Sequence, residues 1–218
     1  MPTPTRQILL SVPLAVSLLV AVLAGSRPDE PQDPKPAVPA GQDPARQPDM
    51  AAMMAQARRF TAPGKQHKEL ERFLGKWQTE TRMFMGDKAM PAEAGTAEFS
   101  WLMPGRWLRS NWSSSMLGNQ YEGFLVLGYD NFKMSFVMTT VTGMDTAMNR
   151  CEGDLDPGGK AMLLYGTIDE YLTGEHDKMV KYIWRFPSAD KLVFEVHDLP
   201  IGENRTKVVE VVYTREAR

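Results

Sequence analysis

From residue 76 almost to the C-terminus, apolar and polar residues alternate with a period of two. In one such stretch Val180, Tyr182 and Trp184 fall on one face. Lys181 and Arg185 fall on the other. Such alternation is typical of β-strands that bury one face. Turn sequences rich in Gly, Asn, Asp and Pro divide the region into ten segments. The predicted strands span 76–85, 94–103, 107–116, 120–129, 132–141, 146–155, 161–171, 177–187, 191–199 and 205–215.

About ten consecutive antiparallel strands, each with one apolar face, must close on themselves or form a sandwich, because an open sheet would leave that face in water. No helical layer is available to cover it, and the connections are short and regular. We therefore predict an all-β protein, a single antiparallel up-and-down β-barrel. If the last strand closes onto the first, Trp77 and Arg215 meet as a structural pair at one end of the barrel.

A short helix is predicted immediately before the first strand. His67, Leu70 and Leu74 share one face at helical spacing, and Gly75 follows where a helix end favours positive φ. We expect this helix to cap the barrel. His67 is then interpreted as a hydrogen-bonded residue beneath the cap and not as a ligand or a base.

Residues 1–26 contain one charged side chain, Arg6, and an apolar run that ends in small residues at Val22–Ala24. This pattern predicts a signal peptide cleaved after Ala24 and an exported protein, periplasmic or secreted. The alternative is an uncleaved anchor that holds the protein in the inner membrane through residues 8–25, although Pro13 interrupts the run.

Residues 27–62 are interpreted as a disordered linker, with seven prolines between residues 27 and 48. Asp49 is placed to cap a possible short helix near its end. Five positive and five negative charges between Arg27 and Arg59 cancel, so the linker as a whole is not a basic arm. The barrel domain is then predicted to span 63–218. The formal net charge of −2 gives no general attraction to nucleic acid.

Candidate chemistry is sparse in this sequence. The three histidines lie on separate predicted elements, without metal-ligand spacing, and no Gly-x-Ser-x-Gly motif occurs. His197 lies opposite the apolar face of its strand, His176 falls in a turn and is expected to be exposed, and Cys151 is expected to be packed. We therefore predict no catalytic residue, no metal site and no cofactor.

Methionine is unusually frequent, with 15 residues. A cluster of thioethers could bind Cu(I), and four methionines lie close together in sequence: Met134, Met138, Met144 and Met148. Met134 and Met138, however, share a face with Phe132 and Phe136. We therefore favour core packing and cavity lining, where flexible thioethers fit varied apolar shapes.

An ordered series of motifs spans about residues 63–216. It comprises Pro63-Gly64, His67, Leu70, Gly75, Trp77, Trp101, Gly105-Arg106, Tyr121-Glu122-Gly123, Gly128-Tyr129-Asp130-Asn131 and Tyr213-Thr214-Arg215. In these motifs the chain resembles the bacterial domain of unknown function 1579 family. The resemblance implies a calycin-like barrel, similar to lipocalins and fatty-acid-binding proteins. It brings no known activity, so no catalytic residue is carried over.

A barrel of this type predicts a small apolar or amphipathic ligand in its interior. The predicted ligand contacts are Arg106, Arg109, Tyr121, Glu122, Tyr129, Met134, Met138 and Trp184. The first alternative is an isomerase or hydrolase that uses the same cavity and an inward acid or base, with Glu98, Glu122 or His67 as candidates. The second is a solid barrel that serves as an interaction module.

Overall fold

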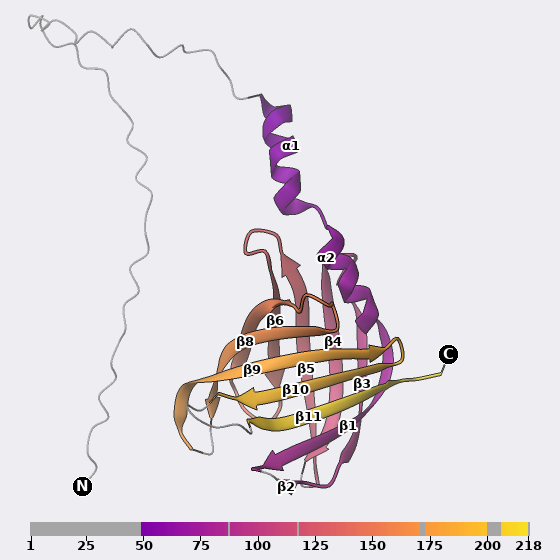
Figure 1. Cartoon of the computed structure of the whole chain (residues 1–218), viewed down its shortest axis with the longest axis vertical. Helices are drawn as coiled ribbons and strands as arrows, with labels where there is room; N and C mark the ends of the chain where they lie inside the picture. Colours follow the sequence, from indigo (N-terminus) through magenta and orange to yellow (C-terminus); the bar gives the residue numbers. More distant parts are fainter. Residues whose placement is uncertain (1–48, 87, 117, 171–172, 200–205, 218) are drawn as a thin grey trace, which may run out of the picture. The chain divides into compact units, whose positions relative to one another are not determined.

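The computed structural model describes residues 49–217 except 87, 117, 171–172 and 200–205 (Figure 1). The predicted signal peptide or anchor and most of the predicted linker therefore lie outside the described residues. In the described part of the chain, no helix combines the length and the apolar character needed to cross a membrane.

The strands form one antiparallel sheet in which nearly every strand pairs with its neighbours in sequence. They are β1 (Gly75–Met85), β2 (Lys88–Ala89), β3 (Glu93–Met103), β4 (Trp107–Met116), β5 (Asn119–Asp130), β6 (Ser135–Thr142), β7 (Met148–Leu155), β8 (Ala161–Glu170), β9 (Glu175–Ser188), β10 (Lys191–Asp198) and β11 (Lys207–Arg215). β11 also pairs with β1, so the sheet closes. In Figure 1, β9, β10, β11 and β1 lie side by side. The predicted up-and-down barrel is confirmed, with the two-residue β2 as an unpredicted addition.

Three helical segments precede the barrel: α1 (Met50–Thr61), α2 (Lys65–Lys68) and the 3-10 helix η1 (Glu69–Phe73). The Asp49 side chain caps α1 by accepting from the backbone N–H groups of Ala51 and Ala52. α2 and η1 form the predicted cap, although as two short pieces instead of one helix. Leu70 and Phe73, which belong to η1, are fully buried.

The closure pairs Trp77 with Arg215 across β1 and β11. The Arg215 guanidinium lies 4.1 Å from the centre of the Trp77 ring. It also donates to the backbone carbonyls of Leu74 and Arg72, the latter at 3.2 Å. The Trp77 indole N–H donates to the Phe73 carbonyl at 2.8 Å, so the cap and the closing strands are tied together at one point.

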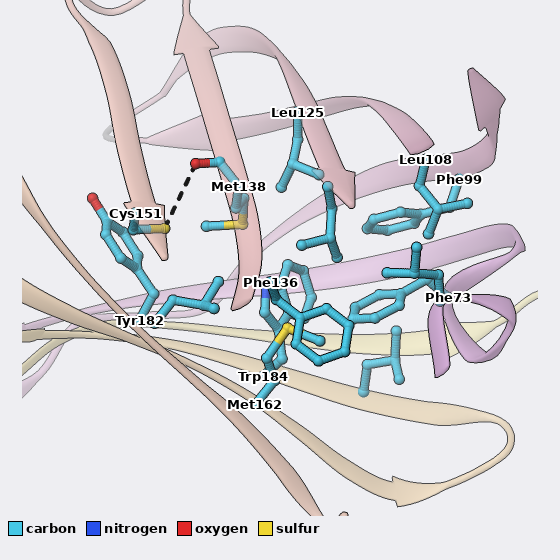
Figure 2. Close-up of a cluster of buried hydrophobic side chains, with 14 of the residues drawn as sticks. Phe73, Phe99, Leu108, Leu125, Phe136, Met138, Cys151, Met162, Tyr182 and Trp184 are labelled. Atoms are coloured by element: carbon cyan, nitrogen blue, oxygen red, sulfur yellow. Dashed lines mark hydrogen bonds between the residues drawn. The ribbon is translucent and has the colours of Figure 1, made fainter. Parts of the chain in front are cut away.

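The core fills the half of the barrel next to the cap. Figure 2 shows Phe73 reaching from the cap into a cluster that contains Phe99, Phe136 and Trp184. The rings of Phe73 and Trp184 meet edge to face, with centroids 5.1 Å apart. The half of the interior next to the cap is therefore a packed apolar core.

The turn before β6 corrects one prediction. Phe132 and Met134 were expected on the inner face of a strand over 132–141, but β6 begins at Ser135 and both side chains are more than 70% exposed. The reason is local. The Asp130 carboxylate accepts from the backbone N–H groups of Phe132 and Lys133, which holds the chain in a turn. Met134 itself adopts φ 54°.

Candidate ligand-binding interior

The half of the barrel opposite the cap, which we call the open half, has fewer buried side chains than the half next to the cap. A closed barrel admits solvent to its inner face only through the lumen. Many inward-facing side chains at this end are only partly buried. They include Thr81, Ser114, Tyr121, Thr140, Asn149, Ile168, Val196 and Val211.

Apolar side chains form the floor of the open half, where it meets the packed core. Leu125, Met138, Tyr182 and Trp184 face inward and are buried. Cys151 lies beside Met138, and its thiol points at the Met138 carbonyl oxygen (Figure 2). Burial raises the pKa of this thiol to about 12, with a smaller contribution from Glu152. The thiol is therefore a packing group and not a nucleophile.

Two polar groups in the interior have no hydrogen-bond partner within the described residues. They are the Ser110 hydroxyl and the Trp184 indole N–H, and both residues are 1% exposed. Both lie next to Phe99: Ser110 pairs with it across β3 and β4, and the Trp184 ring is 6.0 Å from the Phe99 ring. In Figure 2 the Trp184 nitrogen points away from Phe73. Buried polar groups are normally satisfied by protein, water or ligand.

The rim of the open half carries an ion cluster that the strand prediction missed. Lys178 and Asp198 face inward from β9 and β10, and their charged atoms are 2.8 Å apart. Glu170 adds a carboxylate 4.0 Å from the same ammonium. The hydrogen bond that Lys178 donates to Asp198 is the largest factor that raises the pKa of Lys178. The alternation that places Val180 inward also places Lys178 inward, so the signal was present in the sequence.

Of the predicted ligand contacts, four face the interior. Tyr129, Met138 and Trp184 are buried there, and Tyr121 is half-exposed in the open half. They do not form one cluster, because Tyr129 lies at the cap end and packs against His67, with ring centroids 5.6 Å apart.

The remaining predicted contacts lie outside the lumen. Arg109 and Glu122 are exposed on the outer face, because the inward positions of β4 and β5 belong to Leu108, Ser110 and Leu125. Arg109 donates to Ser100 at 3.1 Å.

Arg106 and Met134 occupy turns at the cap end instead of the lumen. Arg106 is exposed and donates to the Thr61 carbonyl of α1. Met134 is the exposed turn residue described above.

The candidate acids and bases are not gathered in the lumen. Glu98 and Glu122 both line a shallow groove of about 780 Å³ on the outer wall of β3 to β6. His67 lies under the cap, 5% exposed, where its Nδ1 accepts from the Gly64 N–H at 3.0 Å. Burial, helped by the charge of Arg106, lowers the pKa of His67. This is the hydrogen-bonded cap residue that the sequence indicated.

The other reactive residues are also dispersed. His176 is exposed, as expected, and His197 faces outward beside Glu195. Met134 and Met148 are exposed while Met138 is buried, so these three thioethers form no common copper site. No group of three His, Cys, Asp or Glu side chains in the described part of the chain is arranged to hold a metal ion.

A closed antiparallel up-and-down barrel with a helical cap is a calycin-like fold. The chain belongs to the family described as protein of unknown function (DUF1579), whose model matches residues 62–215. Among curated protein sequences, none matches this chain.

Several solved structures are similar to this chain. The protein Rv2717c from M. tuberculosis aligns with a TM-score of 0.50 at 9% identity, over 71% of this chain and 99% of that one. A phycobiliprotein lyase of S type, CPES from Guillardia theta, aligns with a TM-score of 0.45 at 12% identity, over 72% and 99% of the two chains. EF1p2_mFAP2b bound to DFHBI aligns with a TM-score of 0.36 at 7% identity, over 70% and 100%. At these identities the first likeness shows the fold alone.

Proposed function

We propose that this protein is an exported barrel that holds a small amphipathic molecule in its open half. The observation that carries the proposal is the set of inward-facing side chains in that half that are only partly buried inside a closed sheet. Protein interiors are otherwise close-packed, so this partial burial is a feature that folding alone does not require. The apolar N-terminal segment of the sequence supports export.

The lining supports an amphipathic guest rather than a purely apolar one. Leu125, Met138 and Trp184 provide an apolar floor, over which a hydrocarbon or ring system loses its contact with water. The walls add the polar side chains of Thr140 and Asn149, which pair across β6 and β7. A few placed polar groups in an apolar pocket are how such sites fix the orientation of a ligand.

Native mass spectrometry of the protein purified from its own host tests this proposal directly. We expect a small molecule to co-purify and to dissociate on unfolding. A matched pair of variants then locates it. Thr140→Trp fills the lumen, whereas Thr139→Trp adds the same side chain to the outer face of the same strand.

We expect Thr140→Trp to lose the bound molecule and Thr139→Trp to keep it, with both variants folded by circular dichroism. Equal retention in both variants would place the molecule outside the lumen. An empty protein that also binds no apolar fluorescent probe would favour the solid interaction module over a binding protein.

A further inference from the structure

Exposed apolar side chains gather at the cap end of this molecule. Among the described residues, eleven large apolar side chains are exposed, and seven of them lie on α1, at the end of β3 or in the turn before β6. We call these seven the cap surface: Met50, Met53, Met54, Leu102, Met103, Phe132 and Met134. A concentration of exposed apolar side chains marks an interaction site.

The three segments that carry the cap surface are tied together. Asn131, in the turn before β6, donates to the carbonyls of Phe60 and Ala62 at 3.1 and 2.9 Å. Phe60 of α1 stacks on Phe132 of the same turn, with ring centroids 4.4 Å apart. Arg106, in the turn after β3, donates to the Thr61 carbonyl. The apolar side chains are therefore presented on segments held by specific contacts.

α1 has the pattern of a helix that lies in a membrane surface. Met50, Met53 and Met54 recur at helical spacing on one face, and no residue of α1 is buried. Arg59 falls on the opposite face. A helix with an apolar face and a basic polar face partitions into the interface of a bilayer.

The charge on this part of the chain has one sign. Between Met50 and Lys68 there are four basic side chains, Arg58, Arg59, Lys65 and Lys68, and no acidic one. The acids that balance the linker all precede Met50. Four clustered basic residues next to an apolar face are complementary to anionic lipid headgroups.

The sequence also contains a predicted signal peptide or membrane anchor. α1 begins at residue 50, and residues 26–49 separate it from the apolar run Ile8–Gly25. We propose that the cap surface, with α1 as its centre, docks on an anionic lipid bilayer, so that the barrel sits on the membrane by its capped end. This docking is independent of any ligand in the open half.

Site-specific fluorescence on the full-length chain tests the proposal, because an apolar N-terminal segment could by itself bring the protein to vesicles. Met54→Cys and Met148→Cys each give one reactive thiol for an environment-sensitive dye, since Cys151 is buried. With phosphatidylcholine vesicles that contain phosphatidylglycerol, we expect a blue shift of the dye at position 54 and none at 148. With phosphatidylcholine alone, the shift at 54 should weaken.

Matched triple variants provide the second measurement. Met50, Met53 and Met54 are 65, 49 and 60% exposed, and Met85, Met148 and Met179, which lie away from the cap, are 71, 71 and 50% exposed. Replacing the first three by Ser should weaken partitioning into the anionic vesicles about tenfold. Replacing the other three should leave it unchanged.

Two results would overturn the proposal. The first is an equal shift of the dyes at positions 54 and 148, which would mean binding through the N-terminal segment without docking of α1. The second is no shift at position 54 with either vesicle, which would leave a protein partner as the occupant of the cap surface.

Discussion

Three residues from the two ends of the barrel domain, Gly75, Trp77 and Arg215, join the cap to the closing strands. Trp77 is fully buried, and its ring lies beneath the Arg215 guanidinium. Gly75 has φ +120°, and a Cβ atom placed there would lie 2.7 Å from Arg215 Nη1. Glycine is therefore required at position 75 for two reasons: the backbone has a positive φ, and a Cβ atom would collide with the Arg215 guanidinium.

Gly75→Ala should lower the free energy of unfolding by about 1–3 kcal/mol, because it strains the backbone and displaces Arg215. Urea denaturation measures the change. Gly64→Ala is the control, since a Cβ atom there meets only the end of the Gln66 side chain, at 3.8 Å. Equal effects of the two substitutions would show that the arginine can move aside freely.

The free thiol of Cys151 is expected to be unreactive in the folded protein. Its pKa is raised to about 12 by burial, so almost no thiolate is present at pH 8. Reaction with a thiol-specific chromogenic reagent should be at least about 100-fold slower than in denaturant. Comparable rates in the two states would mean that the strands around β7 open readily.

Among the elements, the cap is held by a histidine that must stay neutral. The His67 Nδ1 atom accepts a hydrogen bond from Gly64, and burial lowers the pKa of the ring. Protonation removes that acceptor and places a charge beneath the cap, next to Tyr129. The cap of α2 and η1 is thus the element whose attachment depends on pH.

The direction of this dependence follows from linkage. Because the folded pKa of His67 lies below its unfolded value of 6.5, its contribution to stability is complete above pH 6.5 and is lost as the pH falls below it. His67→Gln should therefore flatten the decline in the free energy of unfolding between pH 7 and 5. Part of the decline in the free energy of unfolding should remain in this variant, because the pKa of His197 is also lowered.

The barrel as a unit has two halves that differ in packing. Buried rings fill the half under the cap, whereas inward-facing side chains of the other half remain half-exposed. Both halves are built from the same ten long strands, so a single strand such as β5 crosses from one environment to the other. The ladder of β5 with β4 reaches Asn119 in the open half, whereas the ladder with β6 covers only Gly123–Asp130.

Amide hydrogen exchange should follow this division. Along β5, we expect residues 125–129 to exchange through global unfolding and residues 120–124 to exchange faster through local opening, because few buried contacts hold the open half. Exchange measured by mass spectrometry on peptides from each half tests this. Uniform protection along β5 would indicate that the open half is as tightly packed as the core.

The alternation of residues by itself determined the strands and their closure. All ten predicted strands are present, because a period of two fixes which side chains share a face once a strand exists. It also predicted the meeting of Trp77 and Arg215, since a one-faced sheet must close and its first and last strands then pair. Helical spacing predicted the burial of His67 and Leu70. Helix-end chemistry predicted the positive φ of Gly75.

The tertiary structure corrected several of the predicted interior contacts. Arg109 and Glu122 were predicted from the family-like middle section of the chain, and they lie on the outer face. In the sequence, Phe132 and Met134 continue the alternation of β6. The Asp130 carboxylate, however, accepts hydrogen bonds from the backbone of this segment and holds it in a turn. The partial burial of side chains in the open half is likewise not predictable from the sequence, because it depends on how side chains from many strands, distant along the chain, meet across the lumen.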